Sequence, residues 1–114
     1  MNEVTHRDRA QIIAKLNDEF RTTLTGGTVL MTAGVEALGP QFVAKALASV
    51  RAFNEFTEDN DPHREHDFGA FSIRGQKLFW KIDYYDQSMR YGSENPCDPE
   101  ATCRVLTVML AEEY

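Results

Sequence analysis

The stretch FGAFSIRGQKLFWKIDYY, residues 68–85, carries the most direct evidence for the fold of this chain. Two runs rich in aromatic residues, 68–73 and 78–85, flank the polar connection Arg74-Gly75-Gln76-Lys77. This pattern is typical of a β-hairpin, in which glycine supplies the positive φ of the turn. Because side chains alternate along a strand, one face of the second strand is predicted to lie in the core. That face carries Leu78, Trp80, Ile82 and Tyr84, and the opposite face carries Phe79, Lys81, Asp83 and Tyr85.

Two amphipathic helices and one short strand are predicted before the hairpin. Residues 7–24 repeat apolar side chains at spacings of three and four, which predicts a helix that Gly26-Gly27 ends. The apolar run TVLMT, residues 28–32, predicts a strand. From Pro40 to about residue 56, apolar side chains again recur at helical spacing, which predicts the second helix.

A third helix is predicted after the hairpin. Asp98-Pro99-Glu100 has the residue types of an N-cap and a first helical turn, and Val105, Leu106 and Met109 would lie on the buried side. The predicted order is therefore helix, strand, helix, strand, strand, helix. The simplest fold that buries these apolar faces is α+β: a two-layer sandwich of a small three-stranded sheet with three helices on one face.

The length of 114 residues indicates a single domain, residues 1–114. No apolar run approaches the roughly 20 residues of a membrane span. The polar N-terminus lacks the apolar region of a signal peptide, so we expect a cytoplasmic protein without membrane association. Cys97 and Cys103 do not have the C-x-x-C spacing, and we expect two reduced thiols.

The negative charge is concentrated in the second half of the chain. Of the formal net charge of −6, residues 54–114 contribute −7, because six Lys and Arg face thirteen Asp and Glu there. An acidic surface repels nucleic-acid phosphates and attracts basic protein surfaces. Direct binding of DNA or RNA is therefore not expected, and a protein partner with a basic surface is favoured.

The stretch NDPHREHDF, residues 60–68, supports two interpretations. In the first, His63 and His66 converge on a divalent metal such as zinc, with Asp61 or Asp67 as a third ligand. The spacing argues weakly for this, because HREH follows a proline in a polar loop, whereas H-E-x-x-H lies on a helix. In the second, the loop is structural: Asn60-Asp61-Pro62 forms an Asx-type turn, and Asp67 orients a histidine or caps loop amides.

The outer face of the second hairpin strand also supports two interpretations. If Asp67 lies close to the end of that strand, a loop imidazole, two carboxylates and a lysine share a surface, as in hydrolase or nuclease sites. The catalytic candidates are then His63, His66, Asp67, Lys81 and Asp83. In the other interpretation Lys81 and Asp83 form a surface ion pair, and Phe79 and Tyr85 are covered by a loop or a partner.

Several motifs together resemble a known but uncharacterised family: TGG with VLMTAGV, then NDPHREHDFGAF, FWKIDYYD, YGSENPCDPE and RVLTVMLAEEY. It is a domain-of-unknown-function family of small proteins, mostly from alphaproteobacteria and often encoded on plasmids and other mobile elements. The resemblance covers residues 10–114. The family pattern favours a glycine where this chain has Arg64, which argues against an exacting backbone geometry there. The resemblance implies no catalytic residue and no cofactor, only a context of plasmid or phage maintenance or interference with host systems.

Two hypotheses of function follow. The leading one is a non-enzymatic module that binds a basic surface of a partner protein, through Glu58, Asp59, Asp61, Glu65, Phe79 and Tyr85. The alternative is a small metal-dependent hydrolase or nuclease that holds a divalent metal with His63, His66 and Asp67. A homodimer that buries the exposed aromatic residues is a third possibility.

Overall fold

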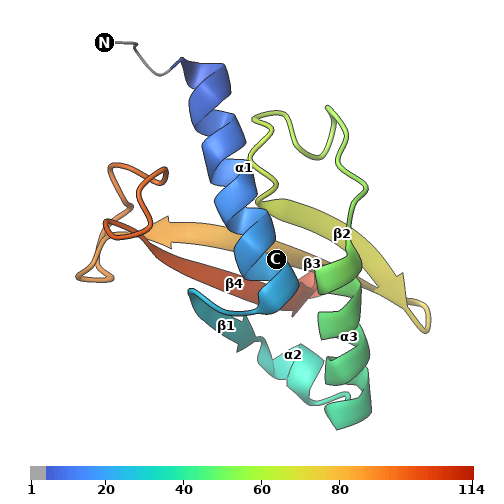
Figure 1. The fold of residues 1–114 in the computed structure, drawn as a ribbon. Coiled ribbons are helices and arrows are strands. Elements are labelled where there is room, and N and C mark those ends of the chain that lie inside the picture. Colours follow the sequence, from blue (N-terminus) through green and yellow to red (C-terminus); the bar gives the residue numbers. More distant parts are fainter. Residues whose placement is uncertain (1–4) are drawn as a thin grey trace.

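The computed structural model describes residues 5–114, which form a four-stranded mixed sheet with helices packed on one face (Figure 1). The strand order is β1-β4-β3-β2, with β1 parallel to β4 and the other neighbours antiparallel. In chain order the elements are α1 (His6–Thr23), β1 (Thr28–Met31), α2 (Ala33–Glu36), α3 (Pro40–Ala52), β2 (Phe68–Ile73), β3 (Gln76–Tyr85), β4 (Cys103–Leu110) and the 3-10 turn η1 (Ala111–Glu113).

The α+β class is as predicted, but the three-stranded sheet and the order helix, strand, helix, strand, strand, helix are wrong. The predicted last helix is the strand β4, which lies between β1 and β3. Asp98 forms a turn instead of capping a helix, because its Oδ1 accepts the amide of Glu100 at 2.9 Å. Because β4 is an inner strand, residues on both of its faces are buried. In a short run that is apolar on both faces, the spacing of apolar residues does not distinguish a strand from a helix.

The two long helices lie close to their predicted positions. A capping box between Thr5 and Asp8 begins α1, and Leu24 ends it in the left-handed conformation. Pro40 occupies the first turn of α3, which ends at Ala52, before the predicted limit near residue 56. The short helix α2 was not predicted.

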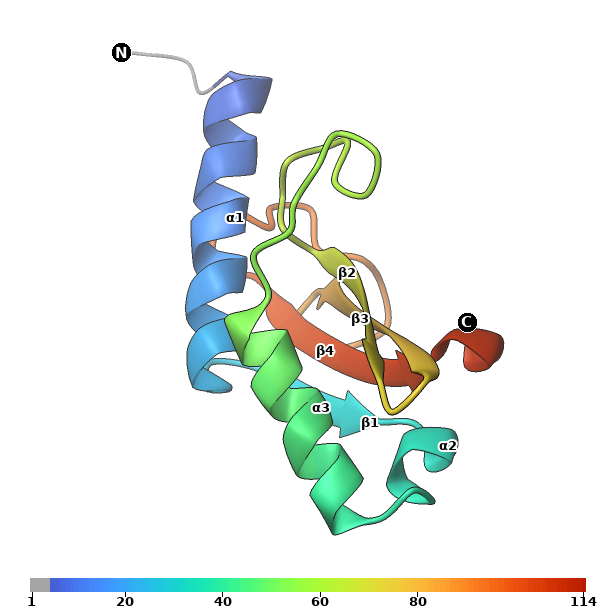
Figure 2. The same ribbon diagram turned by 90° about the vertical axis from the view of Figure 1, so that its right-hand side faces the viewer.

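The hairpin is confirmed. Arg74 and Gly75, with φ of 52° and 79°, form the two-residue turn between β2 and β3. The predicted inner face of β3 lies in the core, with Leu78 and Trp80 fully buried and Ile82 3% exposed. These side chains pack beneath α1 and α3, which cover one side of the sheet in Figure 2.

The core under the helices leaves little free space around the single tryptophan, Trp80. A Cβ atom added to Gly69, the neighbour of Trp80 on β2, would lie 2.2 Å from the indole Nε1. The rings of Phe53 and Phe56 meet the indole edge to face at 5.6 and 6.2 Å. Gly69 is therefore required, because the strand closely approaches the indole.

Among the described residues no helix combines the length and the apolar content of a membrane span.

Candidate functional site

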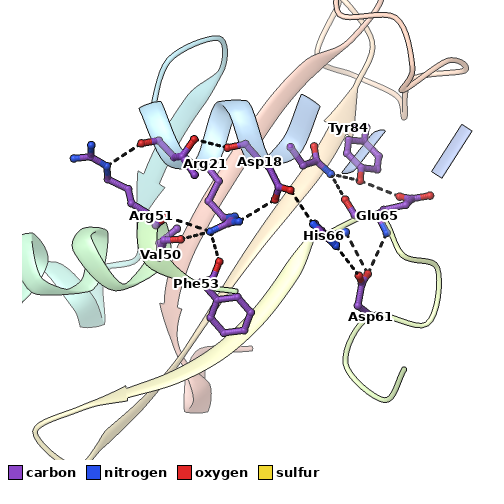
Figure 3. A network of polar contacts seen from close by, with 11 residues as sticks. Asp18, Arg21, Val50, Arg51, Phe53, Asp61, Glu65, His66 and Tyr84 are labelled. Atoms are coloured by element: carbon purple, nitrogen blue, oxygen red, sulfur yellow. Dashed lines mark hydrogen bonds and ion pairs between the residues drawn. The ribbon is translucent and has the colours of Figure 1, made fainter. Parts of the chain in front are cut away.

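The loop between α3 and β2 is held against α1 by His66 (Figure 3). The imidazole Nδ1 lies 2.9 Å from Oδ2 of Asp18 on α1. The imidazole ring also stacks on Phe56, with centroids 3.8 Å apart and planes 2° from parallel. Asp18 additionally accepts a hydrogen bond from Arg21 at 2.8 Å. One carboxylate therefore contacts both the His66 imidazole and the Arg21 guanidinium.

Asp61 organises the loop from inside. Its side chain is 5% exposed, and its Oδ1 accepts the amides of Glu65 at 3.1 Å and His66 at 3.2 Å, while Oδ2 lies 3.7 Å from Nε2 of His66. Arg64 and His66 both adopt positive φ, 57° and 55°. The structural interpretation of this loop is thus supported, with Asp61 capping the loop amides instead of Asp67. Positive φ at Arg64 is a backbone conformation that glycine adopts more readily.

A second polar network joins the loop to α1 and β4. Asn17 donates to Tyr84 Oη at 2.8 Å and to the carbonyl of Glu65 at 2.9 Å, and Tyr84 donates to the Glu65 carboxylate at 2.9 Å. Arg104 donates from Nε to Asn17 Oδ1 at 2.8 Å. Burial raises the pKa of Tyr84 well above its ordinary range, so this phenol stays protonated and donates.

The guanidinium of Arg21 connects α1 to the end of α3. Its Nη1 donates to the carbonyls of Val50 at 2.6 Å and Phe53 at 2.8 Å, at the C-terminal end of α3, where the Val50 carbonyl also accepts the Phe53 amide at 3.4 Å. The guanidinium also lies 5.4 Å from the ring centroid of Phe56 and 5.2 Å from that of Trp80. Sequence reasoning missed Asn17, Asp18, Arg21 and Arg104. Asp18 and Arg21 are three residues apart and pair with each other, but the partners that join these side chains to other elements are distant in the sequence.

The predicted metal ligands are not brought together. His63 is exposed and lines a cavity of about 450 Å³ with His6 and Arg7, whereas His66 faces Asp18 and Asp61. Within residues 5–114, no three His, Cys, Asp or Glu side chains gather in a way that could hold a metal ion. The metal-dependent hydrolase or nuclease stays a prediction that this geometry does not favour.

The catalytic candidates are divided between the two faces of the sheet. Asp67 stands opposite Ile82, whose amide donates to its carbonyl at 2.8 Å, so both side chains point to the helix side. Burial, with the neighbouring Glu65 carboxylate, raises the pKa of Asp67. Lys81 and Asp83 point to the other side and form the predicted ion pair at 2.8 Å. That hydrogen bond raises the pKa of Lys81.

The predicted partner-binding residues also separate into two groups. Glu58 and Asp59 are exposed in the loop, whereas Asp61 is buried and Glu65 is bound to Tyr84. Phe79 and Tyr85 lie on the sheet face that points away from α1 and α3. The four carboxylates therefore do not form one exposed acidic surface, and only Glu58 and Asp59 are exposed.

We call the sheet face away from α1 and α3 the open face. By register and alternation its members come from all four strands: Thr28, Leu30, Phe68, Ala70, Ser72, Lys77, Phe79, Lys81, Asp83, Tyr85, Cys103, Val105, Thr107 and Met109. Leu30 is 49% exposed, whereas Val105 and Met109 are buried. Tyr114, 77% exposed, packs edge to face on Phe68 and Phe79 at 6.1 and 5.5 Å. The contribution of β4 was missed because residues 103–110 were assigned to a helix.

Comparison with known proteins identifies a family and nothing more specific. A search of curated proteins and a search of solved structures gave no match to the chain. The family model described as "Protein of unknown function (DUF3768)" matches residues 31–113. This range includes α2, α3, β2, β3 and β4 and the loop between α3 and β2 that contains His66. The resemblance seen in the sequence is thereby confirmed as membership of an uncharacterised family over this range. The chain belongs to the family of proteins of unknown function DUF3768.

Proposed function

We propose that the protein is a non-enzymatic binding module that docks its open face on a partner protein with a basic surface. The observation that carries this proposal is the open face itself. α1 and α3 cover one side of the sheet, and no helix of comparable length covers the other side in the described part of the chain (Figure 2). An antiparallel sheet face that meets only water is usually polar, whereas this one presents Leu30 and an aromatic cluster.

The aromatic cluster consists of Phe68, Phe79 and Tyr114. The rings of Phe68 and Phe79 lie 5.1 Å apart, and Tyr114 packs on both. Large aromatic side chains that already pack on one another lose little conformational entropy on binding. Aromatic residues are also among those that contribute most of the binding energy at protein interfaces. The cluster therefore suits an anchor in a protein–protein contact.

Acidic residues follow β3 and β4, whereas Lys77 and Lys81 lie on the open face itself. Asp86 directly follows β3, and Glu112 lies in η1 directly after β4. Because β3 and β4 are antiparallel, these two acids belong to opposite ends of the sheet. Asp83, within the face, is already paired with Lys81. Because the chain carries a net charge of −6, this apolar centre favours a partner that carries apolar residues inside a basic rim, and complementary charge speeds association.

The cellular setting is also part of the proposal. The net charge of −6 disfavours nucleic acid as the partner and favours a basic protein. This basic protein could itself bind nucleic acid, in which case the carboxylates of this chain stand in for the phosphates. We place the protein in the bacterial cytoplasm, as an accessory or host-interfering factor of a mobile element. The support for this setting is the sequence resemblance and the absence, among described residues, of a helix able to span a membrane.

The decisive experiment compares two leucines of similar exposure. Leu30 lies on the open face and is 49% exposed, and Leu38 lies between α2 and α3 and is 42% exposed. The tagged full chain and its Leu30→Asp and Leu38→Asp variants are used to capture partners from the native host. The captured protein is then purified, and its affinity is measured at two salt concentrations. We expect Leu30→Asp to weaken binding about tenfold or more and Leu38→Asp to leave it unchanged.

Three results would contradict the proposal. Equal affinities of both leucine variants would show that the open face is not the interface. A partner without a basic surface, or binding that salt does not weaken, would remove the electrostatic argument. A dimeric mass by light scattering that Leu30→Asp converts to a monomer would show that a second copy of the chain covers this face.

A further inference from the structure

Arg104 is a buried cation that has no carboxylate partner in the described part of the chain. Its side chain is 4% exposed, and no Asp or Glu oxygen lies within 4.0 Å of it among residues 5–114. The other buried arginine, Arg21, has Asp18 at 2.8 Å. Burial lowers the pKa of Arg104, which expresses the cost of holding this charge away from water. A charge removed from water without a counter-ion is strongly destabilising.

The protein contacts of Arg104 use only part of its guanidinium. Nε donates to Asn17 Oδ1, Nη2 donates to the carbonyl of Pro96, and the group lies 5.3 Å from the ring centroid of Tyr84. Nη1 has no acceptor among the described residues, yet it is not one of the fully enclosed unpaired atoms. Nη1 and Nη2 therefore retain three N–H groups that have no acceptor among the described residues.

A cavity of about 420 Å³ lies beside Arg104, between α1, the α1–β1 connection and the turn before β4. Its apolar lining comes from Leu16, Phe20 and Pro99. A cation next to an apolar pocket of this volume matches the form of a small organic acid, in which a carboxylate is attached to an apolar body. Two carboxylate oxygens fit the paired N–H groups of a guanidinium edge.

We propose that this cavity binds a small organic acid, with Arg104 as the counter-ion of its carboxylate and the apolar body against Leu16, Phe20 and Pro99. This site lies on the helix side of the sheet and is independent of the proposed open-face interface. A dianionic phosphate is a poorer ligand, because the apolar lining does not solvate it and the chain carries a net charge of −6.

Glu19 provides a sensitive electrostatic test. It is exposed and also lines the cavity, so its carboxylate repels a bound anion. Glu19→Gln removes this repulsion and should tighten binding of an acid by about two- to fivefold at low salt. Glu36, an exposed acid on α2 that does not line the cavity, gives the matched control Glu36→Gln. Replacement of Arg104 is avoided, because its bonds to Asn17 and Pro96 support the fold.

The experiment titrates the ¹⁵N-labelled full chain with benzoate, with its uncharged analogue benzamide, and with inorganic phosphate. We expect millimolar benzoate to shift the amide signals of Thr25 and Gly26 and the Nε–Hε signal of Arg104 saturably. Benzamide should bind about tenfold more weakly than benzoate, or less tightly still, which corresponds to the loss of one charge-assisted contact. Phosphate should also bind about tenfold more weakly, or less tightly still, because the apolar lining does not solvate it. Glu19→Gln should tighten benzoate binding, and Glu36→Gln should not change it.

The contrary outcomes are equally clear. Equal binding of benzoate and benzamide would show that Arg104 does not recognise the charge. Phosphate that competes with equal affinity would show a general anion site. If Glu19→Gln lowers protein stability and benzoate causes no saturable shift, Glu19 is itself the counter-ion of Arg104 in solution, and the proposal is wrong.

Discussion

Asp18 and His66 are 48 positions apart in the sequence, yet Oδ2 of Asp18 lies 2.9 Å from Nδ1 of His66. This contact joins the middle of α1 to the end of the loop that precedes β2. On its other side the imidazole stacks on Phe56 at 3.8 Å, so the ring is held between a carboxylate and an aromatic ring.

His66→Ala should lower the free energy of unfolding by about 1–2 kcal/mol, because it removes one polar contact to a carboxylate and one aromatic stack. Urea denaturation followed by circular dichroism measures the change. His63→Ala is the control, since His63 is exposed in the same loop and should leave the midpoint within experimental error. Equal effects of the two substitutions would show that the loop is not held by His66.

Arg21→Lys should lower the free energy of unfolding by about 2–3 kcal/mol. A lysine carries one compact ammonium and cannot serve Asp18 and the carbonyls of Val50 and Phe53 with the geometry of the guanidinium. Arg51→Lys is the matched control: Arg51 is exposed and donates from Nε to the carbonyl of Thr22 at 2.9 Å. Its replacement should cost less than about 0.5 kcal/mol in the same denaturation experiment.

Gly69→Ala should destabilise the protein by about 1–3 kcal/mol through overpacking. The new Cβ would lie 2.2 Å from Nε1 of Trp80 and 2.8 Å from Cζ of Phe53, so both rings must shift. Because Trp80 is the only tryptophan, its fluorescence spectrum reports the shift alongside the melting temperature. Gly92→Ala, where the nearest atom is Tyr84 O at 3.8 Å, should change neither measurement.

Asp67→Asn should stabilise the protein at neutral pH. Burial and the Glu65 carboxylate raise the pKa of Asp67 above its ordinary value of 3.8, so the folded state binds this proton more tightly than the unfolded state. The stabilising contribution of the group is therefore complete below pH 3.8 and is lost as the pH rises through the folded pKa. The advantage of the asparagine variant should grow across this window and then become constant.

Denaturation midpoints measured from acid to neutral pH check this prediction. Asp59→Asn, at an exposed position of the same loop, is the control and should follow the wild type at every pH. A stability difference between Asp67→Asn and the wild type that decreases with rising pH would contradict the assigned direction of the shift.

The hairpin was predictable because its information is local. Alternation along residues 78–85 separates the buried side chains Trp80 and Ile82 from Lys81 and Asp83, and the turn at Arg74-Gly75 has its own residue preference. The helix α1 was predictable for the same reason, since its caps and its apolar spacing lie within one segment. In both elements the residues of one short segment determine the backbone conformation and also which side chains are buried.

The strand β4 was not predictable in this way. Val105, Leu106, Val108 and Met109 are all buried, so the run has neither strand alternation nor a distinct helical stripe. Its identity depends on pairing with β1, 77 positions earlier, and with β3. The turn at Asp98-Pro99-Glu100 has residues that also suit the start of a helix, and only the strand pairing decides between the two.

The sequence by itself therefore determined the α+β class, the hairpin, the two long helices and the excess of acidic charge. Only the tertiary structure decided the strand order, the open face, the contact of His66 with Asp18 and the position of Arg104 beside a cavity. The physical reason is the range of the interactions. Helix caps, turns and side-chain alternation act over a few residues, whereas these contacts join segments whose distance in the sequence leaves no local pattern to read.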